Sequence, residues 1–165
     1  MNTSASFLLL FCLAICHTEA NAAPAQRVLR PDISLDAAKT VLHATMDFCH
    51  AKGKTLAAAV VDRSGNLVAL QRDDNVGPHN TIAAQRKAYT AVSTKTSTGQ
   101  LADNVRANSQ THNLNTVSEL LLLGGGVPVR SGSAVIGAIG VAGAGGPAVD
   151  ESCAVAAIGQ IFPSN

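Results

Sequence analysis

Residues Val135 to Ser152 read VIGAIGVAGAGGPAVDES, and this stretch decides how the C-terminal half of the chain folds. An apolar run is followed by the glycine-rich segment 143–147 and then by a segment that carries Asp150 and Glu151. Glycine permits a sharp turn, and proline suits the first turn of a helix. The pattern therefore predicts a buried strand over 133–142, a glycine-rich corner, and a helix over about 148–161.

Phosphate-binding loops share this layout, and Gly143-x-Gly145-x-x-Ala148 satisfies the loose dinucleotide fingerprint. That fingerprint also needs a further strand–helix–strand unit and an acidic residue about 20 positions on. Only 17 residues follow Ala148, none after Glu151 is acidic, and the chain has no Gly-Lys-Ser/Thr triplet. We interpret the corner as a structural turn whose exposed amides also suit an anionic group such as a carboxylate.

The N-terminus has a different character from the rest of the chain. Phe7 to Ile15, FLLLFCLAI, is an apolar run too short to span a bilayer, and Ala20-Asn21-Ala22 is a small-x-small cleavage signal. We expect a signal peptide over 1–23, an extended lead-in over 24–32, a single domain over 33–165, and a periplasmic or extracellular protein. A lipoprotein signal ending at Cys16 is the alternative, but Ile15 is too bulky for its cleavage site.

Composition excludes some classes of function. The chain has 12 Lys and Arg against 11 Asp and Glu, one Tyr, no Trp and no basic run, which argues against nucleic-acid binding. No second hydrophobic span follows the leader, so we expect no transmembrane segment in the processed chain. Removal of the leader leaves Cys49 and Cys153. An oxidising compartment permits a disulfide, but no spacing rule pairs these two residues, and buried free thiols are the expectation.

Hydrophobic periodicity predicts the remaining elements. Apolar residues at helical spacing predict helices from Ser34 to about 52, over 81–92, and from Ser97 or Thr98 to about 105, whereas the polar stretch 107–117 is expected to be irregular. Short apolar runs predict strands over 56–62, 66–71, 120–123 and 127–130 in addition to 133–142. The short links between strands favour an α/β unit with an antiparallel sheet and helices on its faces.

Three segments carry a resemblance to a known family. AAVVDRSGNLVALQRDD, IAAQRKAYTAV and the C-terminal GGGVPV…VIGAIGVAGAGGPAVDESCA resemble the GlcG/HbpS-like, or haem-degrading, domain over roughly residues 33–162. The resemblance implies a profilin-like α/β/α fold with a five-stranded antiparallel sheet, assembly into oligomers, and a ligand-binding face near the glycine-rich corner. Some members are secreted haem-binding proteins linked to redox sensing and slow haem breakdown, and a related domain is attached to corrinoid adenosyltransferases.

His79 is the candidate iron ligand, because it lies in the loop NVGPHNT before a predicted helix and neutral imidazole binds iron well. His112, in the polar stretch, is a weaker alternative that would act from a neighbouring subunit. His43 and His50 lie on one face of the first helix and are expected to face solvent or a subunit contact.

Further candidates surround this histidine. Arg86 and Lys87 are candidates for pairing with haem propionates, with an ordinary solvated helix face as the alternative. Gly143 and Gly145 are the candidate ligand-facing positions of the corner. Asp150 and Glu151 are adjacent and cannot face one another, so we expect them to stabilise the start of their helix rather than to form a catalytic pair.

The sequence supports three hypotheses of function. The first is an exported protein that binds haem or a similar tetrapyrrole. The second adds degradation of the haem, for which the sequence shows no catalytic constellation of its own. The third is an accessory domain that binds an organic acid, a corrinoid or a partner protein without metal chemistry. The final helix has few polar positions over 154–158, so we also expect it to pack against another subunit in a homo-oligomer.

Overall fold

The computed structural model describes residues 27–163, and the predicted signal peptide lies outside this range. Residues 27–34 form no regular element, as expected for the lead-in. The elements that follow are α1 (Leu35–His50), β1 (Ala57–Asp62), β2 (Leu67–Arg72), α2 (His79–Thr94), α3 (Thr98–Ala107), the 3₁₀-helix η1 (Ser109–Thr116), β3 (Gly126–Ser131), β4 (Ala134–Ala142) and α4 (Pro147–Ile161).

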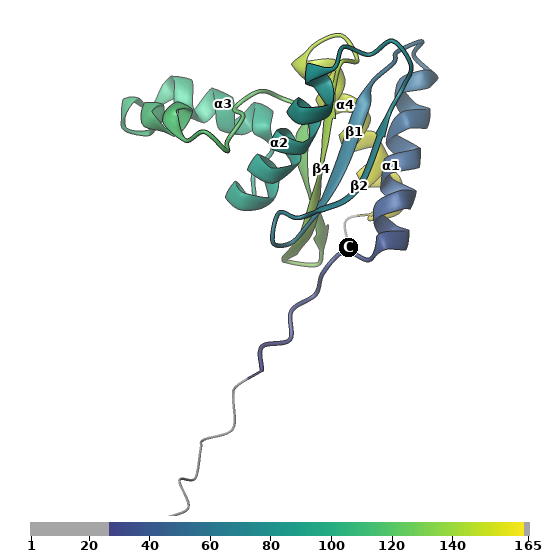
Figure 1. Ribbon diagram of the computed structural model, residues 1–165. Coiled ribbons are helices and arrows are strands. Elements are labelled where there is room, and N and C mark those ends of the chain that lie inside the picture. Colours follow the sequence, from purple (N-terminus) through teal and green to yellow (C-terminus); the bar gives the residue numbers. More distant parts are fainter. Residues whose placement is uncertain (1–26, 164–165) are drawn as a thin grey trace, which may run out of the picture.

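The strands form one antiparallel sheet in the order β2-β1-β4-β3. Helix α2 packs on one face of this sheet, and α1 and α4 lie side by side on the other (Figure 1). The α/β class with helices on both faces of an antiparallel sheet is therefore confirmed. The predicted number of five strands is wrong, because the sheet has four strands within residues 27–163.

The segment predicted as the fifth strand, 120–123, is held by side chains instead of by a strand partner. The Leu121 amide donates to Thr90 Oγ1, the Leu120 carbonyl accepts from Arg86, and the Leu123 carbonyl accepts from Thr98 Oγ1. These three bonds satisfy backbone groups that a sheet ladder would otherwise pair. The four leucines thus form a tethered loop that leads into β3.

Strand β1 lies inside the sheet and is covered on both faces, which explains why its residues form a continuous apolar run. Ala58 and Val60 belong to the core beneath α1 and α4, whereas Ala57 and Ala59 face the α2 side, and all four are fully buried. Gly140 of β4 lets α2 approach closely, since a Cβ atom there would lie 2.0 Å from the Ala84 carbonyl oxygen. The small residues of the sheet therefore set the position of α2.

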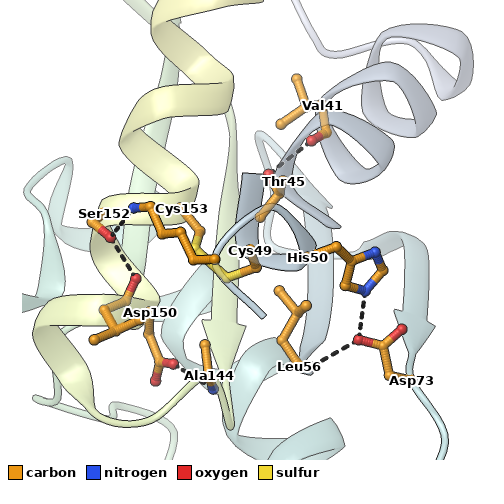
Figure 2. The surroundings of a disulfide bond; sticks show 12 residues. Val41, Thr45, Cys49, His50, Leu56, Asp73, Ala144, Asp150, Ser152 and Cys153 are labelled. Carbon is orange, nitrogen blue, oxygen red and sulfur yellow. Dashed lines mark hydrogen bonds and ion pairs between the residues drawn. A yellow bond between two sulfur atoms is a disulfide. The ribbon is translucent and has the colours of Figure 1, made fainter. Parts of the chain in front are cut away.

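The two cysteines form a disulfide, which corrects the expectation of free thiols (Figure 2). Cys49 lies at the end of α1 and Cys153 in α4, with 104 residues of separation, a Cα–Cα distance of 5.6 Å and no exposed surface. Helical packing of α1 against α4 brings them together, and spacing along the chain gives no sign of this. The bond ties the two helices of one layer to each other.

Helix α3 and η1 project away from the sheet (Figure 1). Residues 109–116, predicted to be irregular, form a 3₁₀-helix in which no residue is buried. Across residues 27–163, none of the helices combines the length and apolar character needed to cross a bilayer.

Candidate functional site

The outer face of α2 carries the candidate site. Its inner face is made of alanines: Ala84, Ala88 and Ala91 have no exposed surface and lie against the sheet. Side chains three or four positions apart share one side of a helix. His79, Ile82, Arg86 and Tyr89 follow that spacing on the outer face, and we call these four residues the α2 stripe.

His79 is the first residue of α2 and is exposed. Its ring lies over Gly77, where a Cβ atom would be 3.0 Å from Cε1 and 3.2 Å from Nδ1. Within residues 27–163 the imidazole takes part in no hydrogen bond or ion pair. Along the same helix, Ile82 is 64% exposed and Tyr89 is 37% exposed. The stripe therefore combines an accessible imidazole with apolar surface.

Arg86 lies in the same stripe, and one nitrogen of its guanidinium is occupied. One Nη2 atom donates to the carbonyls of Ser118 and Leu120, both at 2.7 Å, and Nε is buried without a partner in the described part of the chain. These bonds hold the segment after η1 against α2. Arg86 therefore acts first as a positioning residue, and only its remaining Nη1 group is available for an anionic ligand.

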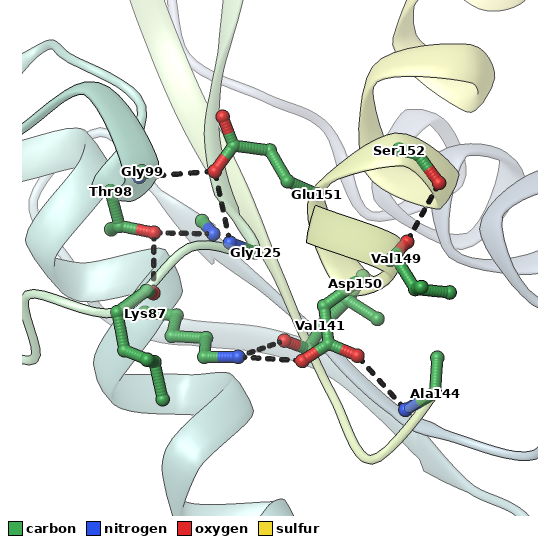
Figure 3. A network of polar contacts seen from close by, with 12 residues as sticks. Lys87, Thr98, Gly99, Gly125, Val141, Ala144, Val149, Asp150, Glu151 and Ser152 are labelled. Atoms are coloured by element: carbon green, nitrogen blue, oxygen red, sulfur yellow. Dashed lines mark hydrogen bonds and ion pairs between the residues drawn. The ribbon is translucent and has the colours of Figure 1, made fainter. Parts of the chain in front are cut away.

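Lys87 lies on the opposite side of α2 and is 1% exposed. Its ammonium donates to the Val141 carbonyl and to Asp150 Oδ2, each at 2.8 Å, and Asp150 Oδ1 accepts from the Ala144 amide at 2.9 Å (Figure 3). This closed network joins α2, β4 and α4. It does not match the predicted role of Lys87 towards a propionate, because the ammonium faces no solvent, and we leave Lys87 out of the site.

The glycine-rich corner lies beside the start of α2. Gly143 has a φ of +97°, and a Cβ atom there would be 3.2 Å from the Asn80 side chain. Gly145 and Gly146 also have positive φ values, and only Lys54 Nζ comes near Gly145, at 3.8 Å from the position of a Cβ atom. The corner is a turn, as predicted, and it places Gly143 beside Val76 and Asn80, which flank His79 in the chain.

The alternative ligand His112 is exposed in η1. It belongs to the projecting part of the chain, whereas His79 begins the helix on the sheet (Figure 1). The proposed role of His112 required a neighbouring subunit, and it remains a prediction.

A cavity of about 370 Å³ opens at the C-terminal half of the stripe. It is lined by Val61, Gly65, Leu67, Gln85, Arg86, Tyr89, Ser118 and Glu119. The Tyr89 ring covers Gly65, where a Cβ atom would lie 2.7 Å from Cδ2. Sequence reasoning missed this cavity because its walls come from a hairpin turn, a helix and a loop that are far apart in the chain; the turn glycine Gly65 was the only local signal.

Comparison with known proteins identifies the family. The model of the family described as haem-degrading, HbpS-like proteins matches residues 33–159. The chain belongs to the HbpS-like family. Among solved structures, a double mutant of HbpS from Streptomyces reticuli is 34% identical, with a TM-score of 0.76 over 86% of this chain and 98% of that chain.

Two further relatives extend the comparison. An uncharacterised 15.0 kDa protein from the dhaT-dhaS intergenic region of Citrobacter freundii is 33% identical over 87 residues, which span 52% of this chain and 61% of that relative. PduOC, solved as a haem complex, is 22% identical and has a TM-score of 0.72, with coverage of 81% of this chain and 97% of that chain. At this identity PduOC supports the shared fold alone.

Proposed function

We propose that this protein binds haem on the α2 stripe and works as an exported haem-binding protein. The observation that carries the proposal is the accessible His79 imidazole beside exposed apolar surface, in a chain of a family described as haem-degrading. His79 would provide the axial nitrogen, Ile82 and Tyr89 would contact the macrocycle, and the Nη1 group of Arg86 would donate to a propionate.

A second subunit is part of this proposal. Cavities that enclose a drug-sized ligand usually measure roughly 300–1,000 Å³. The cavity beside Arg86 and Tyr89, at about 370 Å³, is at the small end of that range, so one protomer would hold only part of a haem. A partner subunit would cover the rest. Light scattering with and without hemin tests this, and a monomer in both conditions contradicts it.

Titration with hemin tests the site. We expect a saturable shift of the Soret band, and His79→Ala should weaken binding about tenfold or more, a loss of ~1.4 kcal/mol. His43→Ala is the matched control, because His43 is an exposed histidine on α1, in the layer on the other face of the sheet. Equal affinities of the two variants would remove His79 from the site, and the absence of any saturable shift would reject haem binding. A parallel titration with cobalamin tests the corrinoid alternative.

We propose further that the protein degrades the haem that it binds. Bound haem would supply the redox chemistry of its iron, and the protein would hold and shield the macrocycle. Peroxide, or dioxygen together with a reductant, should then bleach the Soret band of the complex with formation of an open tetrapyrrole. Bleaching of free hemin at the same rate, with the same products, would leave a binding protein without this activity.

A carboxylate ligand at the glycine-rich corner is the second candidate function. Helix α4 begins after Gly146 without a side-chain cap, and Lys54 Nζ lies next to Gly145. An ammonium near a helix N-terminus suits an organic acid. A thermal-shift series of small carboxylates, with Lys54→Gln as the variant, separates this function from haem binding.

A further inference from the structure

A second cavity, of about 640 Å³, lies between α3 and α4. Helix α3, the first turns of α4 and the loop before β3 form its walls, with Gly99, Leu123, Pro147, Glu151 and Val155 among the lining residues. Its volume is within the usual range for small-molecule sites. None of the residues of the α2 stripe lines it, so it is independent of the proposed haem site.

Glu151 is fixed in one orientation at this cavity. Its Oε2 atom accepts hydrogen bonds from the amides of Gly99 at 3.0 Å and Gly125 at 3.1 Å. Figure 3 shows the second carboxylate oxygen pointing away from these two amides. Because Oε2 is held by groups on α3 and on the loop before β3, the side chain needs no rearrangement to present Oε1 to a donor.

Hydrogen bonds also fix the walls of the cavity. Thr98, the first residue of α3, is fully buried, and its hydroxyl donates to the Leu123 carbonyl and accepts from the Gly126 amide, both at 2.8 Å (Figure 3). Ser97 caps the same helix by accepting from the Gln100 amide. A site with rigid walls loses little conformational freedom when a ligand binds.

The cavity also has apolar and basic surface. Leu123 is 44% exposed and Val155 is 53% exposed, so a ligand that covers them removes apolar area from water. Arg106 lines the cavity and is paired with Asp103 of its own helix, with both side chains more than two-thirds exposed. An exposed pair of this kind is weak, so the guanidinium is available to a better carboxylate.

The charges around the cavity favour a ligand that carries both signs. Glu151 and Asp103 are acidic, and Arg106 is cationic and paired with Asp103. The two helix N-termini contribute about half a positive charge each, and Lys52 donates to Ser152 at the rim, which disfavours a ligand that is only a cation. Glu151 disfavours a ligand that is only an anion.

We propose that this cavity binds a free α-amino acid with an apolar side chain. The ligand ammonium donates to Glu151 Oε1, its carboxylate accepts from Arg106, and its side chain covers Leu123 and Val155. This gives the protein a small-molecule site that is separate from haem binding.

Titration of the ¹⁵N-labelled protein with leucine tests the proposal, with the Gly99 and Gly125 amides as reporters. We expect saturable shifts of both amides. 3-Methylbutylamine lacks the carboxylate and 4-methylpentanoate lacks the ammonium. The affinity for each should be at least about tenfold lower than the affinity for leucine. Leucine that produces no saturable shift, or 4-methylpentanoate that binds as well as leucine, overturns the proposal.

Two variants locate the contacts. Glu151→Gln keeps an oxygen for the two amides but removes the charge, so it should weaken leucine binding about tenfold while the amide pattern of the fold is retained. Asp103→Asn is the matched control, because it removes the other carboxylate and frees Arg106, and it should bind leucine at least as well as the wild type. Equal affinity of Glu151→Gln and wild type overturns the proposal. His79→Ala should bind leucine normally, which keeps this test independent of the haem test.

Discussion

Removal of the Cys49–Cys153 disulfide should cost the domain much of its stability. The bond connects the end of α1 to α4 across 104 residues, and both cysteines are fully buried. Closing a loop of about 100 residues removes unfolded-state entropy worth about 4.7 kcal/mol at 25 °C. Domains of this size are stable by only about 5–15 kcal/mol, so this loss amounts to about a third of the stability or more.

Urea unfolding gives the measurement. The oxidised protein is compared with protein that has been reduced in denaturant and refolded with the reductant present, because the buried bond is inaccessible in the native state. We expect a loss of about 2–5 kcal/mol in the free energy of unfolding. Mass spectrometry of the alkylated protein confirms in each sample whether the thiols are free.

The double variant Cys49→Ala, Cys153→Ala is the control. It has no thiol to reduce, so its stability should be the same with and without reductant, and it should resemble the reduced wild type. If oxidised and reduced wild type differ by less than about 1 kcal/mol, loop closure does not stabilise this fold, and the reasoning from chain entropy is refuted.

Three further predictions concern single positions. Lys87→Met should lower the free energy of unfolding by about 3–5 kcal/mol in urea titrations, because it leaves the Asp150 carboxylate buried and unpaired. The double variant Lys87→Met, Asp150→Leu should recover most of this loss. Equal losses in both variants would contradict a charge-pairing role. Gly140→Ala should lower the melting temperature by an amount equivalent to about 1–3 kcal/mol, since the new Cβ atom meets a backbone carbonyl of α2 at 2.0 Å; an unchanged melting temperature would mean that α2 moves away freely. Burial by itself raises the pKa of the Asp62 carboxyl, but hydrogen bonds from residues 64–66 outweigh it and lower the pKa below its ordinary value of 3.8. A lowered folded-state pKa contributes stability above the unfolded pKa that is lost as pH falls through the folded value, so wild type should lose more stability below about pH 4 than Asp62→Asn; parallel acid profiles would reject the contribution.

Local patterns were sufficient for most elements. Ser34 caps α1 by accepting from the Ala37 amide, the turn before β2 closes a hairpin, and the glycine-rich corner leads from β4 into α4, all as the sequence predicts. Each of these features depends on residues within a few positions of one another, where periodicity, caps and turn residues act directly. The run of leucines at 120–123 shows the limit of such patterns, because the side chains of α2 and α3 satisfy its backbone groups.

Some features of the candidate sites follow from local sequence, and others depend on the tertiary structure. The sequence by itself indicated that a helix follows the His79 loop and that Ile82 and Tyr89 share a face of it, because a helical period depends only on spacing. The structure begins this helix at His79 itself. Only the tertiary structure decided that Lys87 is buried on Asp150 and that Arg86 holds the 118–120 segment. The same is true of the cysteine pair and of the Glu151 cavity. Each of these joins segments from separate layers of the fold, and such contacts depend on how helices pack on the sheet, which no local spacing along the chain specifies.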